Sequence, residues 1–167
     1  GVRVLADNVA STLGPRGRNV ILQEKGKMPI ITKDGVTVAK FVDLDDPVEN
    51  AAAQIVKQAS AKTNVDAGDG TTTSTVLTRA IFEAAQQYIQ QGKSPTELKR
   101  GIDKAVEVVV QELKERARPI ATAEDIAHIA TISANNDKSI GDLIALAVDK
   151  VGKDGSITIE EANSVDT

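Results

Sequence analysis

The chain has 167 residues, of which 41% are hydrophobic, and its formal net charge is −4. The acidic pI of about 5.1 argues against a general nucleic-acid binder, because such a protein needs a basic face. The absence of cysteine excludes disulfides and thiolate metal sites. The single histidine, His128, argues against a histidine-rich zinc site and against a Ser-His-Asp triad that relies on a second histidine.

The few aromatic residues and the short apolar runs bear on the composition of the core and on the cellular location. Only Phe41, Phe82 and Tyr88 are aromatic, so we expect an aliphatic core, which favours closely packed helices. No apolar run approaches the roughly 20 residues that span a bilayer, and we expect no signal peptide. A soluble cytoplasmic protein without a membrane partner is therefore expected. Because the chain begins at Gly1 inside an apolar-periodic segment, we also expect it to be a portion of a longer protein.

The N-terminal part is predicted to form one short helix and two short strands. Apolar residues recur with helical spacing over residues 2–9, and Gly14-Pro15 should end that helix. Residues 19–22 and 29–32 are typical of strands. Asp34-Gly35 leaves two alternatives open: a tight hairpin turn leading into a strand, or a short helix capped by Asp34.

Long helices are predicted for the middle of the chain. Asp45-Asp46-Pro47 starts one, whose apolar face extends to Ala59. A second apolar-periodic segment runs from Val76 to Gly92, and a third helix runs from Ser94 to about Arg116. Ser94 and Glu97 have the spacing of a capping box, with Pro95 at the first turn.

Pro119 is the one plausible domain boundary, and a second block follows it. This block is predicted to contain a helix capped at 122–125, a break at Asn135-Asn136-Asp137, and a helix from Ile140 that Gly152 closes. A strand is expected over residues 156–160. The fold class is therefore mainly α with a few short β-strands.

The stretch Asp66-Ala-Gly-Asp-Gly-Thr-Thr-Thr-Ser-Thr75 has the pattern of a phosphate-binding loop. Glycines allow a sharp turn and close approach of a ligand, and the free N–H groups at the start of the following helix favour an anion. Asp69 is suited to hold the divalent cation that accompanies a nucleotide phosphate. The alternative is an ordinary loop whose threonines cap a helix.

Two further loops are candidates for the same ligand. Thr12-Leu-Gly-Pro-Arg-Gly17 is either a second nucleotide clamp or a simple helix terminator. In Ile31-Thr-Lys-Asp-Gly35, Lys33 could neutralise phosphate charge and Asp34 could orient a water or contact the cation. Alternatively, the segment is an ordinary turn. The chain has no P-loop, because its single Gly-Lys-Ser, Gly92-Lys93-Ser94, has Gln87 where the pattern Gly-x4-Gly-Lys-[Ser/Thr] needs its first glycine.

Five segments together, in this order, resemble the group I (GroEL-type) chaperonins over the whole of residues 1–167. They are Val9-Ala-Ser-Thr-Leu-Gly-Pro-Arg-Gly-Arg-Asn19, Ile31-Thr-Lys-Asp-Gly-Val36, Ala67-Gly-Asp-Gly-Thr-Thr-Thr73, Leu98-Lys-Arg-Gly-Ile-Asp-Lys-Ala105 and Thr131-Ile-Ser-Ala-Asn135. Group II chaperonins share a Gly-Asp-Gly-Thr-Thr core, whereas the first and last segments resemble group I.

The resemblance implies an ATP-driven protein-folding machine. It implies a homo-oligomer in a double heptameric ring, a GroES-type co-chaperonin lid, unfolded polypeptide clients, and ATP, Mg²⁺ and potentially K⁺ as cofactors. Residues 1–116 would form the N-terminal half of the equatorial ATP-binding domain, which is a helical bundle, and 117–167 the first segment of the intermediate domain. The apical domain and the C-terminal equatorial half would be absent, so we expect this chain alone not to hydrolyse ATP at a useful rate.

The resemblance also implies roles for individual residues. Asp34 would take part in hydrolysis, Lys33 would lie beside the phosphates, and Asp69 would bind magnesium. The remaining nucleotide contacts would come from Thr12, Leu13, Gly14, Pro15, Gly70, Thr71, Thr72 and Thr73, with Ile132 near the adenine. Arg16 stands where lysine is frequent in the family, and both are cationic.

A different class of function stays open beside this one. The chain could be a non-catalytic nucleotide-binding or helical interaction module. A metal-dependent phosphohydrolase would need a cluster of carboxylates with a histidine, which the sequence does not offer.

Overall fold

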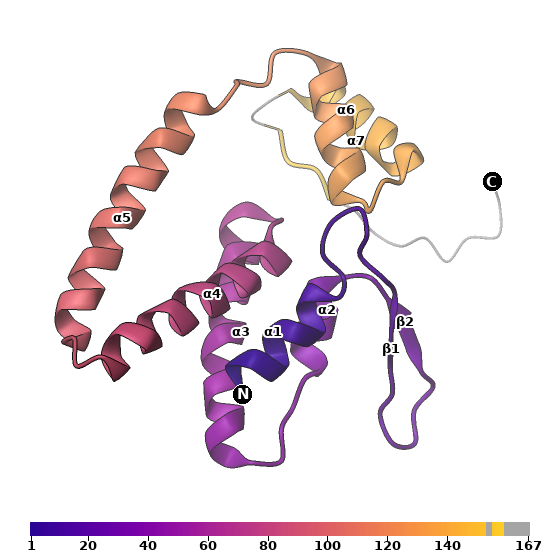
Figure 1. Ribbon diagram of the computed structural model, residues 1–167. Coiled ribbons are helices and arrows are strands. Elements are labelled where there is room, and N and C mark those ends of the chain that lie inside the picture. The colour runs from indigo at the N-terminus through magenta and orange to yellow at the C-terminus, as the bar shows by residue number, and fades with distance from the viewer. Residues whose placement is uncertain (153–154, 159–167) are drawn as a thin grey trace. The chain divides into compact units, whose positions relative to one another are not determined.

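The computed structural model describes residues 1–152 and 155–158 and is mainly helical, which confirms the predicted fold class (Figure 1). The chain divides into two compact units, Gly1–Val106 and Glu107–Thr167. The division falls inside one helix, α5 (Pro95–Arg116), so each unit is described by itself. Within the described residues, no helix has both the length and the apolarity needed to cross a membrane.

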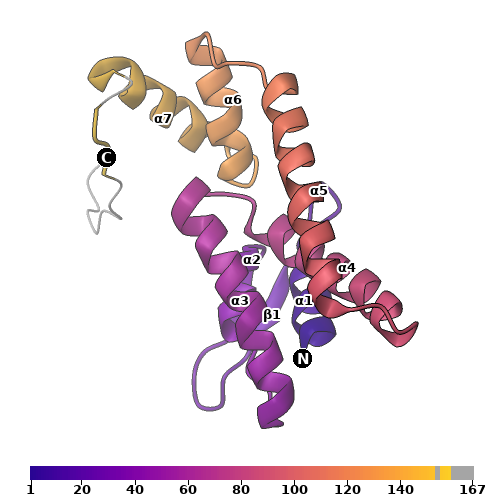
Figure 2. The ribbon, with the colours of Figure 1, turned by 90° about the vertical axis from the view of Figure 1, so that its left-hand side faces the viewer.

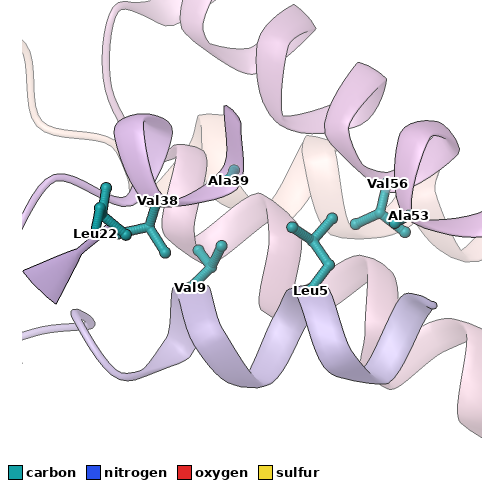
Figure 3. Close-up of a cluster of buried hydrophobic side chains, with 7 residues drawn as sticks. All are labelled: Leu5, Val9, Leu22, Val38, Ala39, Ala53 and Val56. Atoms are coloured by element: carbon teal, nitrogen blue, oxygen red, sulfur yellow. The ribbon is translucent and has the colours of Figure 1, made fainter. Parts of the chain in front are cut away.

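The core of the first unit lies between three helices and one strand, and a fourth helix packs beside it. Helix α1 (Val2–Ala10) packs against α2 (Gly35–Phe41), α3 (Pro47–Ala67) and α4 (Thr71–Gln90). Leu5 and Val9 point from one face of α1 into this core and are fully buried. The side chains of the core are small and aliphatic, as the composition predicts; they are Leu5, Val9, Leu22, Val38, Ala39, Ala53 and Val56 (Figure 3).

Leu5→Ala tests the importance of this core. The substitution removes a fully buried side chain that fits between helices, so we expect the free energy of unfolding to fall by about 2–5 kcal/mol. Val4→Ala is the matched control, because Val4 is 41% exposed on the same helix and should cost no more than about 0.5 kcal/mol. Urea unfolding followed by circular dichroism measures both, and equal losses would contradict this description of the core.

The two short strands form an antiparallel ribbon. β1 (Val20–Leu22) pairs with β2 (Ile30–Thr32), with Val20 opposite Thr32 and Leu22 opposite Ile30. Both strand predictions are confirmed to within a residue. Leu22 joins the core, whereas Ile21 and Ile31 on the other face are exposed.

The start of α2 resolves the ambiguity at Asp34-Gly35 in favour of the helix. The Asp34 carboxylate accepts hydrogen bonds from the backbone N–H groups of Val36 at 3.2 Å and Thr37 at 2.9 Å, which makes Asp34 the N-cap of α2. The hairpin alternative is wrong, because this capped turn continues as helix to Phe41.

Helices α3 and α4 form an antiparallel pair joined by a very short connection. Asp46 caps α3, and Gly68, with a φ of 71°, ends it in the left-handed conformation. α4 begins at Thr71, so the threonines make up its first turn and do not precede it. Ser60 and Thr75 are buried between the two helices, where both hydroxyls donate to the Thr71 carbonyl.

α5 begins at Pro95 and ends at Arg116, as predicted. None of its residues is buried, although its sequence is amphipathic. Val106, Val109 and Leu113 are 50%, 56% and 61% exposed. Among the described residues, this part of the apolar face of α5 is therefore largely open to solvent.

The second unit contains a helical hairpin, with α6 (Ala123–Ser133) and α7 (Lys138–Val151) side by side (Figures 1 and 2). Asn135 and Asn136 turn the chain with positive φ values of 55° and 69°, which confirms the predicted break. The backbone of Gly141 lies against the Thr131 hydroxyl, where no side chain would fit. A strand was predicted for 156–160; residues 156–158 are irregular, and 159–160 lie outside the described part.

The caps of this hairpin predict a pH dependence. Hydrogen bonds from the Ala121 and Thr122 N–H groups, and then from the Thr122 hydroxyl, lower the pKa of Asp125. This completes the capping box predicted for 122–125. A carboxylate with a lowered pKa stabilises the fold above its unfolded pKa, and this contribution is lost as the pH falls through the folded value.

We therefore expect Asp125→Asn to destabilise the hairpin at pH 7, and the difference from wild type to shrink as the pH falls through the lowered pKa of Asp125, because the wild-type carboxyl then becomes neutral too. Thermal unfolding can be followed on the methyl signal of Ala130, which is buried in α6. Asp142→Asn, at an exposed position of α7, is the control. A difference from wild type that persists unchanged at low pH would contradict the assignment.

Candidate functional site

The first candidate loop closes the C-terminal end of α1. Thr12 is buried, and its hydroxyl donates to the Val9 carbonyl at 2.8 Å. The backbone of Gly17 lies directly on the Thr12 carbonyl, so that position has no room for a side chain. Leu13, Gly14 and Pro15 form the exposed part of this loop, and Gly14 has a φ of 69°.

The second candidate loop leads from β2 into α2. Lys33 is half-buried and Asp34 is exposed. Besides capping α2, the Asp34 carboxylate accepts a hydrogen bond from the Thr37 hydroxyl at 2.6 Å. The carboxylate is thus held at the helix start by three donors, while its exposure leaves it open to solvent and to a ligand.

The third candidate loop is the connection between α3 and α4. Gly68 and Gly70 both have positive φ values, 71° and 85°, and Asp69 lies between them. The Asp69 carboxylate accepts a hydrogen bond from the Gly70 N–H at 2.5 Å. These two left-handed residues allow α3 to reverse into α4 within three residues.

The N-terminus of α4 has no side-chain cap, since its N-cap residue is Gly70. By contrast, side chains cap α2, α3, α6 and α7. Thr71 is buried, Thr72 is half-buried and Thr73 is exposed along this first turn. An uncapped N-terminus presents its N–H groups and the positive end of the helix dipole to an anion.

The structure brings the second and third loops into contact. A Cβ at Gly35 would overlap the Thr72 hydroxyl oxygen and would lie 3.2 Å from Thr72 Cβ. The same position would lie 3.4 Å from Val9 Cγ1, one turn before the first loop. The starts of α2 and α4 and the end of α1 therefore meet at one end of the first unit.

Ile132 is the one predicted site residue outside this group. It lies in the second unit, on α6, where it is 67% exposed. Its predicted role near the adenine stays a prediction. His128, on the same helix, lies 3.8 Å from Glu124 and is exposed, as expected for a surface residue.

The chemistry of the site is that of phosphate binding with one or two carboxylates. Lys33 supplies a cation, the start of α4 supplies N–H donors, and Asp34 and Asp69 supply carboxylates. Among the described residues, no group of three or more His, Asp or Glu side chains could hold a metal by itself. A Mg²⁺ ion shared with substrate phosphates fits this donor set, because Mg²⁺ takes one or two carboxylates and keeps several waters.

The hydroxyl contacts behind the third loop are neighbours of the candidate site that the motifs of the sequence do not predict. The Thr63 and Ser74 hydroxyls are hydrogen-bonded at 3.0 Å, and the Ser60 hydroxyl donates to the Thr71 carbonyl at 3.4 Å. The signal for these contacts is Ser60 and Thr63 three residues apart, on a helix that otherwise packs through alanine and valine. They link the first turn of α4 to α3.

Comparisons with known proteins point to one family. A model of the TCP-1/cpn60 chaperonin family matches residues 5–166. Among solved structures, the chain is similar to the crystal structure of a group III chaperonin in the open state, with a TM-score of 0.74 and 25% sequence identity. The match covers 89% of this chain and 30% of that chain, so the matched part spans less than a third of that chain's length.

Proposed function

Because the chain belongs to the TCP-1/cpn60 chaperonin family, we propose that its first unit binds Mg-ATP and that a complete subunit uses ATP hydrolysis to fold non-native polypeptides. The observation that carries this proposal is the contact between Gly35 and Thr72. This contact joins Lys33 and Asp34 to the uncapped start of α4, and thus joins a cation, two carboxylates and a set of N–H donors at one place.

Each group has a role that fits its position. The N–H groups at the start of α4 and Lys33 would bind phosphate oxygens, with Gly70 allowing close approach. Asp69 would hold Mg²⁺, which offsets the phosphate charge when it is bound. The exposed carboxylate of Asp34 would orient the attacking water. The loop Thr12-Leu-Gly-Pro15 would line the nucleotide, and Ile132 would lie near the adenine.

We assign the chain to group I within the family. This assignment rests on the segments Gly14-Pro-Arg-Gly-Arg-Asn19 and Thr131-Ile-Ser-Ala-Asn135. The similarity to a group III structure supports the family and the fold. A double heptameric ring, a GroES-type lid and a cytoplasmic location belong to the same proposal.

The exposed apolar face of α5 supports the proposal that more chain completes the domain. Residues 1–116 would form the N-terminal half of an equatorial domain and 117–167 the start of an intermediate domain. The remainder of the subunit would cover Val106, Val109 and Leu113, since large exposed apolar patches favour association. The same face is what favours the second candidate, a helical interaction module without catalysis.

The experiment compares the 167-residue chain with a chain extended along its reading frame. Binding is followed with a fluorescent ATP analogue, and hydrolysis by phosphate release. We expect Mg²⁺-dependent binding and turnover from the extended chain, and no useful turnover from the 167 residues. Asp69-dependent turnover by the short chain would overturn the prediction that it is incomplete. Failure of the extended chain to bind Mg-ATP would favour the interaction module.

A further inference from the structure

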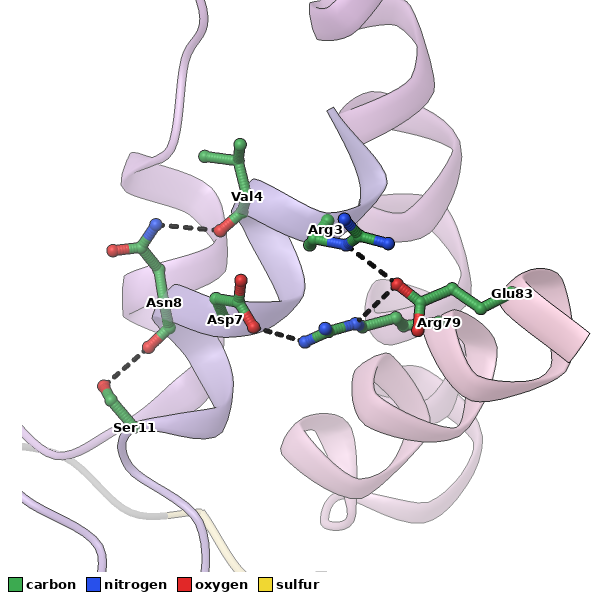
Figure 4. A network of polar contacts seen from close by, with 7 residues as sticks. All are labelled: Arg3, Val4, Asp7, Asn8, Ser11, Arg79 and Glu83. Atoms are coloured by element: carbon green, nitrogen blue, oxygen red, sulfur yellow. Dashed lines mark hydrogen bonds and ion pairs between the residues drawn. The ribbon is translucent and has the colours of Figure 1, made fainter.

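Four charged side chains of alternating sign join α1 to α4 (Figure 4). Arg3 and Asp7 lie one turn apart on α1, and Arg79 and Glu83 lie one turn apart on α4. Arg3 Nε donates to Glu83 Oε1 at 3.0 Å, Arg79 Nε donates to the same oxygen at 3.2 Å, and Arg79 Nη1 donates to Asp7 Oδ1. We call these four residues the charge square.

The pairing of the charges shows how α1 and α4 are oriented relative to each other. Arg3 is opposite Glu83 and Asp7 is opposite Arg79, so the residue numbers rise along α1 as they fall along α4. The two helices are therefore antiparallel here, and the C-terminal end of α1 is directed toward the N-terminal end of α4. Those two ends carry the Thr12 loop and the first turn at Thr71.

The same order distinguishes the observed register from a slipped one. A shift of one helical turn would place Asp7 opposite Glu83 or Arg3 opposite Arg79, which brings like charges together. An exposed ion pair adds little to stability, but like-charge contacts are unfavourable and can specify a register. The aliphatic contacts of Leu5 and Val9 are non-directional, so they specify the register less sharply.

The hydrogen bonds of the square favour the charged forms of Arg79 and Glu83. The hydrogen bond to Glu83, followed by the one to Asp7, raises the pKa of Arg79 above its usual value. Hydrogen bonds from Arg3 and Arg79 lower the pKa of Glu83. The α4 half is partly shielded from solvent, with the Arg79 and Glu83 side chains 27% and 35% exposed, whereas Arg3 is 71% exposed.

We propose that the charge square sets the register of α1 against α4 and thereby positions the Thr12 loop relative to the first turn of α4. The inference rests on the proposed nucleotide site, because its functional consequence is the affinity for Mg-ATP. Arg3, Asp7, Arg79 and Glu83 are thus positioning residues that do not touch the nucleotide.

Two charge swaps, each of which leaves the amino-acid composition unchanged, test the proposal in the 167-residue chain. Arg3→Asp with Asp7→Arg reverses the order on α1, and Arg79→Glu with Glu83→Arg reverses it on α4. Either swap alone places like charges opposite each other, and we expect the Kd for Mg-ATP to rise about tenfold. Combining all four substitutions restores opposite charges, and we expect the Kd to return to within about threefold of wild type.

The register itself is measured by electron spin resonance distances between nitroxides at Asn8→Cys and Gln87→Cys. Both positions are exposed, and the chain has no other cysteine. We expect a single nitroxide–nitroxide distance in the parent and in the fourfold variant. In each single swap we expect the distance to shift, or a second population to appear, because α1 moves along α4 by one helical turn, about 5 Å. If a single swap does not fold, the proposal still requires that the fourfold variant fold and show the same nitroxide–nitroxide distance as the parent.

The outcomes separate the two proposals. Single swaps that leave the distance unchanged overturn the register assignment. A changed distance with an unchanged Kd overturns the positioning role. If the parent binds no Mg-ATP while the distances behave as expected, the nucleotide function fails and the register assignment stands.

Discussion

Asp69→Asn is expected to weaken Mg-ATP binding at least about a hundredfold, because the substitution removes the carboxylate charge that would hold the cation. In the wild-type chain, the Gly70 N–H donates to Asp69 Oδ1 at 2.5 Å. Asparagine keeps an oxygen that can accept this hydrogen bond. The loop should therefore keep its conformation while losing its charge. Isothermal titration calorimetry with ATP, at saturating and zero Mg²⁺, measures the change.

Asp66→Asn is the matched control for this prediction. Asp66 lies three residues away in the last turn of α3, where its carboxylate pairs with Lys62 at 3.0 Å. We expect this variant to bind Mg-ATP like wild type, since an exposed ion pair of this kind contributes little. Equal losses in both variants would mean that nearby negative charge in general, and not Asp69, governs binding.

Gly35→Ala is expected to give the largest loss of stability among single substitutions at the site. The new Cβ would overlap the Thr72 hydroxyl, so the Thr72 side chain must turn away or the starts of α2 and α4 must separate, and we expect the separation because the Thr72 Cβ is also only 3.2 Å away. Overpacking of this kind costs about 1–3 kcal/mol, and the separation would also move Asp34 away from the start of α4. We expect urea unfolding to report the first effect and Mg-ATP titration the second, as a Kd raised at least about tenfold.

A rescue and a control accompany this substitution. Thr72→Ala removes the hydroxyl that the new Cβ would overlap. The double variant Gly35→Ala with Thr72→Ala should therefore recover most of the lost stability, because the nearest remaining distance is the 3.2 Å between the new Cβ and the Cβ of residue 72. Gly101→Ala, in α5, meets nothing within 4 Å and should instead stabilise the helix by about 0.5–1 kcal/mol. A stable Gly35→Ala variant with normal affinity would show that the close approach has no importance.

The elements that are visible in local sequence could be predicted well. The helix starts at Pro47 and Pro95 and the capping box of Thr122 and Asp125 depend on residues close in sequence, and the structure has them as predicted. Asp34 remained ambiguous because Asp-Gly suits both a hairpin and a helix cap. The helix formed because the carboxylate could cap it and Val38 could enter the core.

Long-range contacts of the site could not be predicted in this way. The Gly35 approach to Thr72 and the pairing of Arg79 with Asp7 join residues that are far apart in the chain. Neither contact has a local signature in the sequence. Asp34-Gly35 has the pattern of a turn, and Arg79 has the spacing of an ordinary i,i+4 surface pair with Glu83, so nothing indicates its contact with Asp7. The three loops could be recognised as candidates from sequence, whereas the packing of α1, α2 and α4 was needed to bring them together.

The most direct test of the central proposal is a titration of the full chain with Mg-ATP, followed by NMR of labelled threonine methyl groups. Thr12 lies in the first loop and Thr71–Thr73 form the first turn of α4, directly after the third loop, while Thr96 and Thr122 lie far along the chain in the first turn of α5 and at the cap of α6. We predict saturable, Mg²⁺-dependent shifts of the methyl signals of Thr12 and Thr71–Thr73, and none for Thr96 and Thr122. Unchanged signals for the loop threonines at saturating Mg-ATP would contradict the proposed nucleotide site.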